Sequence, residues 1–444
     1  MCSSDLVTTT DPNGNTSQFS ASTSGLSGTL SPQEGNHLPY TRLRTKEPKE
    51  LEDNRIGTHF CDLWHPASYQ EVFPGLVLDV STICELGLKR IRLTINNLDS
   101  HRVDWTKPEF FIDPSHDAFI GDLAANGITV TYVLSFWDTA NHPEGWEEIS
   151  SRFKTEEEIQ RYLEFVHFIV HHFKDRIQYF EIWNEPDNDP FPVQYIEVAD
   201  YINLVKRAVP FIRQEYPEAK IVVGSTAYLR IPQSYNYLFS ILRSEIMPLV
   251  DVVAWHPMYG TSPEYDFHRQ YYYEYPSIVQ EIKDVASAHG FGGEYEADEL
   301  TWRTPERAVS NLPWPHTYSE TKCAKYLARG IVMHLGMDVA VSQHGHYPDQ
   351  AQLFRTIQNL CTIMAGARPI TLPIQIQSEA GDLTSYSFSL SDGSRLIALW
   401  TDGVAVDDDP GVKATLTIPG FADQTAIGID VLHGFEQRDR KSVV

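Results

Sequence analysis

Hydrophobic positions change period repeatedly along the chain between residues 54 and 368. Short runs of β-branched and aromatic residues, typical of buried strands, alternate with stretches whose apolar residues recur every three or four positions. The expected helices include Glu156–Phe173 with Thr155 as its cap, Val198–Tyr216, Ser277–His289 and Glu320–Leu335. The expected strands are Arg55–Phe60, Arg90–Asn96, Thr129–Phe136, Ile177–Asn184, Ile221–Ser225, Val252–His256, Glu294–Glu299 and Val339–Gln343.

This alternation predicts an α/β fold, specifically a (β/α)8 TIM barrel, because eight strands are each followed by a helix or a long loop. A doubly wound open sheet is the main alternative. Such a sheet usually carries a glycine-rich phosphate-binding turn after its first strand, and GTHF at residues 57–60 is no such turn.

After Pro369 the pattern changes to period two with turn residues between the runs. It predicts a small C-terminal antiparallel β-sandwich over residues 369–438, or its truncated remainder. The runs are ITLPIQIQS, SYSFSLSD, SRLIALWTDG and VKATLTIPG.

The two ends of the chain differ from the rest. Residues 1–36 are rich in Ser, Thr, Gly and Asn, which predicts a disordered tail, and residues 37–368 are expected to form the barrel. The first six residues (MCSSDL) and the last six, 439–444 (DRKSVV), resemble translated sequencing adapters, as in a metagenomic fragment. We expect a secreted or cell-surface protein whose export signal was lost by truncation, with a cytoplasmic location as the alternative.

Composition excludes some classes of partner. Lys and Arg total 35 against 60 Asp and Glu, and the formal net charge of −25 disfavours nucleic acid as a partner. No apolar run reaches the ~18 residues of a membrane span, so no membrane partner is expected. The 5 cysteines show no CxxC spacing, so we expect no zinc knuckle and no disulfide framework.

Candidate chemistry lies where the predicted strands end, because a barrel carries its functional residues there. Two carboxylates from strands that face each other across a barrel mouth favour cleavage of a glycosidic bond. The candidates are His59, Arg92, Trp137, Asn184, Glu185, His256, Tyr259, Glu299 and Trp302, with Asn97, Gln343, His344 and His346 as weaker ones.

Glu185 has a structural alternative. In YFEIWNEPDND, Asn184 could cap a helix whose first turn holds Glu185 and Pro186. The aromatic strand before it, fourth of eight, favours a catalytic acid instead.

For the second acid, strand alternation places Tyr295, Ala297 and Glu299 on one face. This set, with a large, a small and an acidic side chain, is expected to face the barrel interior. Glu296 is the alternative acid, and Asp298 is expected to anchor a loop or support the site.

The WNEP sequence at the end of the fourth strand resembles the acid/base motif of clan A retaining glycoside hydrolases. The resemblance implies that Glu185 is the acid/base and that Asn184 binds a sugar 2-hydroxyl. EYEADELTW looks like the nucleophile strand of this clan, which implies that Glu299 is the nucleophile. Arg92 matches an arginine that supports the acids, and VVAWHPMYG matches a sixth-strand His and Tyr, here His256 and Tyr259.

Within the clan, FEIWNEP and AWHPMYG look nearest to family 39, which holds β-xylosidases and iduronidases. Asp298 departs from the small hydroxyl residue that often precedes the nucleophile. The resemblance implies a β-xylosidase-like enzyme that hydrolyses plant or microbial oligosaccharides or polysaccharides without a cofactor. An endo-acting glycanase of the same clan is the alternative.

The expected mechanism is double displacement with retention. Two carboxyls about 5–5.5 Å apart cannot both ionise easily, so Glu185 keeps a proton for the leaving group while Glu299 attacks. The indoles of Trp137, Trp255 and Trp302 are candidate sugar platforms, with Trp137 and Trp302 preferred. The tyrosine-rich run at residues 269–276 is expected in a long loop that walls the cleft.

Two other classes of protein function remain as alternatives to a glycoside hydrolase. His344 and His346 suggest a metal-dependent hydrolase, and a carbohydrate-binding barrel without turnover is the other. His167, His171 and His172 also have metal-like spacing, but their amphipathic helix predicts partly exposed surface histidines.

Overall fold

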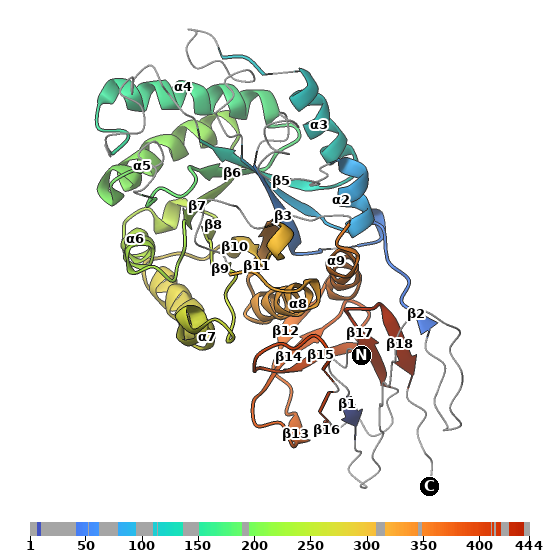
Figure 1. Ribbon diagram of the computed structural model, residues 1–444. Helices are drawn as coiled ribbons and strands as arrows, with labels where there is room; N and C mark the ends of the chain where they lie inside the picture. The colour runs from blue at the N-terminus through green and yellow to red at the C-terminus, as the bar shows by residue number, and fades with distance from the viewer. Residues whose placement is uncertain are drawn as a thin grey trace, which may run out of the picture.

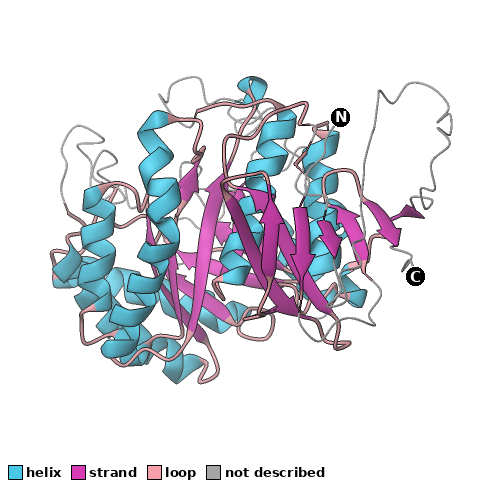
Figure 2. Ribbon diagram, turned by 90° about the horizontal axis from the view of Figure 1, so that it is seen from below, coloured by secondary structure: helices cyan, strands magenta, loops and turns pink. Residues whose placement is uncertain are grey.

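Eight parallel strands close into a barrel in the described part of the computed structural model (Figures 1 and 2). Each strand pairs with the next, and the last pairs with the first. Every predicted strand overlaps one of them, so the predicted barrel is confirmed. The strands are β3 (Ile56–Cys61), β4 (Arg90–Thr94), β5 (Thr129–Leu134), β6 (Tyr179–Ile182), β7 (Lys220–Thr226), β8 (Val252–Trp255), β10 (Glu294–Thr301) and β11 (Ala340–His344).

The structure describes residues 7–9, 41–51, 53–61, 79–94, 110–112, 114–135, 151–188, 195–307, 316–344, 349–409, 411–412, 414–418 and 426–438. No helix in these ranges is both long and apolar enough to cross a bilayer. The short strand β9 (Met258–Tyr259) pairs with the end of β10. The helices are α2 (Val80–Leu86), α3 (Pro114–Ala125), α4 (Glu156–Phe173), α5 (Val198–Glu215), α6 (Pro232–Leu242), α7 (Asp266–Ala288), α8 (Glu320–Gly336) and α9 (Ala351–Met364).

Helix α4 illustrates how local sequence sets these elements. Thr155 caps it by accepting a hydrogen bond from the Glu158 amide at 3.2 Å. Three acidic residues in the first turn stabilise the helix further by their favourable interaction with the helix dipole. The apolar residues of α4 are buried except for the half-buried Phe168, whereas its histidines and most of its acids face outward. The predicted bounds and cap of this helix are confirmed.

Helix α7 corrects one prediction, since it includes residues 269–276 that we expected in a loop. Tyr271 and Tyr275 lie four residues apart and therefore share one helical face. Tyr271 donates to the Pro257 carbonyl at 2.9 Å, and Tyr275 accepts from Trp255 Nε1 at 2.9 Å. These buried contacts favour the helix over the expected loop.

The C-terminal segment forms three small sheets beside α8, with antiparallel pairing among the C-terminal strands, as predicted (Figure 1). Two N-terminal strands join them: β1 pairs in parallel with β16, and β2 pairs with β18. β1 falls inside residues 1–36, predicted as a disordered tail; the rest of that tail lies outside the described residues. The strands are β1 (Val7–Thr9), β2 (Thr41–Arg42), β12 (Arg368–Ile370), β13 (Gln375–Ser378), β14 (Leu383–Ser389), β15 (Arg395–Thr401), β16 (Ala414–Thr417), β17 (Ile427–Asp430) and β18 (Phe435–Arg438).

The two faces of β10 are the reverse of the prediction. Tyr295 packs outward against Phe291, whereas Glu296 accepts a hydrogen bond from Ser342 inside the barrel at 2.9 Å. In a parallel sheet, register partners share a face, and Glu296 pairs with Ala254 of the inner cluster. The interior is therefore lined by the set that contains Glu296 and Asp298.

Candidate active site

The carboxyl ends of the barrel strands bring seven of the predicted residues into one cluster, in agreement with the position expected for a barrel. Ion pairs and hydrogen bonds connect all of them. They are His59, Arg92, Asn184, Glu185, His256, Tyr259 and Glu299.

Arg92 is the charged centre of this cluster and is 1% exposed. Its Nε donates to Glu181 Oε2 at 2.8 Å and lies 3.1 Å from Asp298 Oδ2. Its Nη2 donates to Asn184 Oδ1 at 2.8 Å. Burial lowers the pKa of Arg92, but Glu181 and Asp298 outweigh burial and raise it well above its ordinary value. The guanidinium therefore stays charged.

His59 is a neutral hydrogen-bonding residue in the cluster. Burial and the charge of Arg92 hold the pKa of His59 well below its ordinary value. Its Nδ1 lies 2.8 Å from Arg92 Nη1, which can only donate, so Nδ1 accepts and Nε2 carries the proton. Glu299 Oε2 lies 3.2 Å from that Nε2. His59 can thus orient Glu299 without adding charge.

The chain turns sharply at the end of β6, where Trp183 and Glu185 have positive φ angles of 70° and 46°. Such angles cost of order 1–3 kcal/mol each in residues other than glycine, and they cluster at functional sites. The turn sends the Trp183 ring outward onto Phe153 (centroids 5.1 Å apart), while the Glu185 amide donates to the Ser225 carbonyl at 3.0 Å. The strained turn therefore presents the Glu185 carboxyl at the barrel mouth.

The helix-start interpretation of Asn184 is wrong. Its side chain binds Arg92 rather than a helix amide, and none of residues 184–188 is helical. Among the described residues, the next helix begins only at Val198.

His256 lies between the two candidate acids and is fully buried. Its Nδ1 is 3.1 Å from Glu185 Oε1, and its Nε2 is 3.8 Å from Glu299 Oε2. Burial lowers its pKa, but the charges of Asp298, Glu299 and Glu185 outweigh burial and raise it to about 9. The ring is therefore an imidazolium at neutral pH and attracts both carboxyl groups.

Tyr259 completes this network. Burial, then the charges of Glu299 and Glu185 and a hydrogen bond to Glu299, raise the pKa of Tyr259 well above its ordinary value. The phenol keeps its proton, which it donates to Glu299, and its oxygen lies 2.8 Å from His256 Nδ1.

Glu299 reaches the mouth because β10 and β11 lose register between Ala297 and Leu300. A register shift of this kind can turn a side chain toward the barrel interior although strict alternation along the strand would place it on the outer face. The side chains of Glu185 and Glu299 are 18% and 13% exposed, against 0% for Glu181 and 2% for Asp298. Of these four acids, the predicted pair has the more exposed side chains.

Sequence reasoning missed Glu181 and Ser225. Glu181 is a fully buried acid between apolar neighbours in β6, which by itself signals a buried cationic partner. Ser225 donates to Asp298 Oδ2 at 2.6 Å. Burial raises the pKa of Asp298 to about 6, although Arg92 and His256 oppose the rise. The contacts of Asp298 with Arg92 and Ser225 agree with the expectation that Asp298 supports the site.

Trp255, Trp302 and Gln343 do not join this cluster. Trp255 is fully buried and donates to the Tyr275 hydroxyl at 2.9 Å. Trp302 is 4% exposed, donates to the Thr261 carbonyl at 2.8 Å and packs close to Gly330 of α8, so its ring offers no open face to a sugar. Gln343 binds Thr58 at 3.1 Å. Trp137, Asn97 and His346 lie outside the described residues.

One group at the mouth has donors that suit a metal ion. Possible ligand atoms of His59, Glu299 and His344 lie within 4.8 Å of one another. However, Arg92 Nη1 lies 2.8 Å from His59 Nδ1, and Arg303 Nη2 lies 3.1 Å from His344 Nδ1. Two guanidinium groups and the His256 imidazolium oppose a divalent cation here, so the fit is poor.

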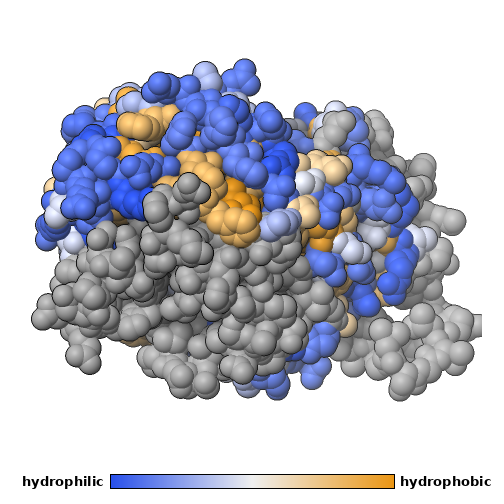
Figure 3. Space-filling model, turned by 90° about the horizontal axis from the view of Figure 1, so that it is seen from above, coloured by the Kyte–Doolittle hydropathy of each residue, from blue (hydrophilic) through white to orange (hydrophobic). Residues whose placement is uncertain are grey.

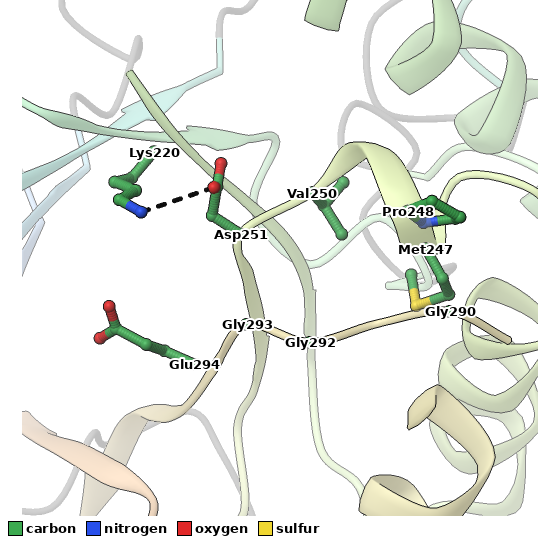
Figure 4. Close-up of a pocket in the computed structure, with 9 residues that line it drawn as sticks. All are labelled: Lys220, Met247, Pro248, Val250, Asp251, Gly290, Gly292, Gly293 and Glu294. Atoms are coloured by element: carbon green, nitrogen blue, oxygen red, sulfur yellow. Dashed lines mark ion pairs between the residues drawn. The ribbon is translucent and has the colours of Figure 1, made fainter. Parts of the chain in front are cut away.

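A pocket of about 340 Å³ lies near the amino ends of β7, β8 and β10, the opposite end of the strands from this cluster (Figure 4). Its Lys220 pairs with Asp251 at 3.6 Å, and Asp251 also binds Arg213 at 2.6 Å. None of the predicted site residues lines this pocket.

The fold and the cluster together define a (β/α)8-barrel protein with two accessible acids at its mouth. No family model matches the chain. Its structure is similar to a family 39 glycoside hydrolase from Bacteroides cellulosilyticus, with a TM-score of 0.58 at 14% identity over 88% of this chain and 80% of the other. It is also similar to a monomeric β-xylosidase from Caulobacter crescentus, with a TM-score of 0.50 at 15% identity over 86% and 77% of the two chains. At these identities the likeness establishes a shared fold.

Proposed function

We propose that the chain is a retaining β-glycoside hydrolase with Glu185 as acid/base and Glu299 as nucleophile. The observation that carries this proposal is the position of His256, whose two ring nitrogens face the two accessible acids. The acid that follows β6 and the acid in β10 thus contact the same imidazole ring at the barrel mouth, as a pair that acts on one glycosidic bond would.

In this mechanism Glu299 attacks the anomeric carbon while Glu185 gives its proton to the leaving oxygen. His59 and Tyr259 hold the Glu299 carboxylate in position for attack. Glu185 then takes a proton from the water that releases the sugar, so the anomeric configuration is retained. We infer that Asn184, whose Oδ1 accepts a hydrogen bond from Arg92, binds the sugar hydroxyl next to the anomeric carbon.

We infer a β-xylosidase-like activity on oligosaccharides or polysaccharides, supported by the family 39 and β-xylosidase folds that the chain resembles. The test is turnover of a panel of aryl β-glycosides, with proton NMR of the first product. The β-anomer is expected. The α-anomer would show inversion, and no turnover of any substrate would favour a binding protein.

Glu296→Gln is a matched control for Glu299→Gln. Glu296 lies deeper in the barrel, bound to Ser342, so its replacement should leave the chemistry intact in the folded protein. Glu299→Gln should abolish turnover. The reverse outcome would make Glu296 the nucleophile.

A further inference from the structure

Helices α4 and α5 lie side by side on the outside of the barrel (Figure 1). His167 and His171 are four residues apart on α4, so both project from the same face toward the end of α5. Their side chains are 54% and 65% exposed. In the view from above Figure 1, the surface outside the grey atoms is mostly hydrophilic (Figure 3).

Glu215, the last residue of α5, faces this histidine pair. Its Oε1 lies 2.7 Å from His171 Nδ1, and its Oε2 lies 3.6 Å from His167 Nδ1. The two imidazole centroids are 5.9 Å apart. One ligand atom from each of the three residues lies within 4.8 Å of the other two.

We propose that His167, His171 and Glu215 form a surface site for a zinc-class divalent cation, separate from the barrel mouth. Two imidazoles and a carboxylate are a donor set that Zn²⁺ accepts, with water as the fourth ligand. The exposed histidines can turn with little resistance to the ~2 Å bond lengths that Zn²⁺ needs. Imidazole donors disfavour Mg²⁺ and Ca²⁺, which prefer oxygen.

One cation already competes for this site, because Lys174 Nζ lies 2.6 Å from Glu215 Oε1. Glu215 Oε2 faces His167, so a bound ion can coordinate Oε2 while Lys174 stays paired with Oε1. Replacing Lys174 by Ala should therefore strengthen metal binding and not weaken it.

The same helix supplies a matched control. His172 follows His171, but its Nε2 lies 2.5 Å from Asp117 Oδ1, and Arg176 Nη2 binds the same oxygen at 2.8 Å. Its ring is engaged away from Glu215. His172→Ala thus removes a neighbouring histidine without removing a proposed ligand.

The experiment is a calorimetric titration of the full chain with ZnCl2, repeated with MgCl2. We expect one surface Zn²⁺ per chain, an affinity at least tenfold weaker in His171→Ala and in His167→Ala, and parental affinity in His172→Ala. We expect no Mg²⁺ binding and a Tm that rises with ZnCl2 in the parent, since an ion that binds only the folded state stabilises it.

Three outcomes would overturn the proposal. They are no zinc binding, binding that both ligand variants retain, and binding that His172→Ala also loses. Circular dichroism of each variant checks that it folds. The result is independent of the proposed hydrolase activity, which the same variants should retain.

Discussion

Arg92 and Glu181 form an enclosed ion pair, with Arg92 Nε 2.8 Å from Glu181 Oε2 and neither side chain more than 1% exposed. The same guanidinium binds Asn184 and lies 3.7 Å from Glu299. A buried charge needs a fixed partner, so Glu181 fixes the position of the Arg92 guanidinium. Arg92 in turn holds Asn184 and Glu299 at the barrel mouth.

Glu181→Gln should therefore lose both stability and turnover. Removing one partner of a buried pair costs about 3–5 kcal/mol of unfolding free energy. Misplacement of catalytic groups by about 1 Å can cost ~10²-fold in rate, so we expect kcat to fall by about that factor. Denaturant unfolding and steady-state kinetics of the folded fraction measure the two effects.

Asp251→Asn is the control for Glu181→Gln. It breaks an ion pair with Arg213 at the opposite end of the strands and should lower stability while kcat stays unchanged. Parental kcat in Glu181→Gln would refute the positioning role of Glu181.

Glu185→Gln should separate proton donation from nucleophilic attack. It should abolish turnover of substrates with poor leaving groups, because no acid remains to protonate them. Aryl glycosides with activated leaving groups should keep part of the first step, and azide should partly restore turnover by replacing water. No rescue by azide on any activated substrate would contradict the acid/base assignment.

His59 offers a test of its tautomer. The amide oxygen of Asn can stand in for Nδ1 and accept from Arg92, whereas the amide nitrogen of Gln can stand in for Nε2 and donate to Glu299. If the important contact of His59 is the one from Nε2 that orients Glu299, His59→Gln should keep a kcat at least tenfold higher than that of His59→Asn. Equal losses in the two variants, measured on one aryl glycoside, would count against that role.

Much of the architecture was predictable from the sequence because parallel strands and their covering helices impose different hydrophobic periods. The cap at Thr155 and the bounds of α4 follow from local residues alone. The tyrosines of α7 were misassigned because their burial depends on partners such as Trp255, which no local pattern reveals.

The acids at the mouth were predictable from strand ends, but their orientation was not. Strict alternation assigned the inner face of β10 to Tyr295 and Glu299, whereas the register shift lets Glu299 join the inward-facing Asp298. Glu181 was missed because its role depends on Arg92, 89 positions away in sequence.

Chelation tests the metal-dependent alternative suggested by His344. Because Arg92 and Arg303 already bind the histidines beside Glu299, we expect EDTA to leave kcat unchanged. A loss of activity that added Zn²⁺ restores would contradict this expectation and favour a metallohydrolase. Repeating the assay with His171→Ala excludes an effect through the proposed surface site.

The charge on His256 should depend on Asp298. Burial alone would keep His256 neutral, and Asp298 contributes most among the groups that raise its pKa to about 9. Asp298→Asn removes that charge, so the His256 titration, followed by ¹⁵N NMR, should move to lower pH. Glu185 and Glu299 on the mouth side and Tyr259 beside the ring also act on His256 and remain in the variant. So do the neighbouring rings of His59 and His344, which couple electrostatically to His256.

The raised pKa of His256 also predicts how the stability of the protein depends on pH. An unfolded histidine has a pKa of about 6.5, so a folded pKa near 9 stabilises the protein fully below pH ~6.5 and progressively less as pH rises to 9. Asp298→Asn should flatten this decline between pH 6.5 and 9, measured as unfolding free energy in urea. Ser225→Ala is the control, since it removes the 2.6 Å hydrogen bond to Asp298 but not its carboxyl. Loss of that hydrogen bond raises the pKa of Asp298, so the slopes are compared between pH 8 and 9, where the carboxyl stays charged and the parental slope is expected. If the slope is equally steep in Asp298→Asn and the parent, Asp298 does not set the charge of His256.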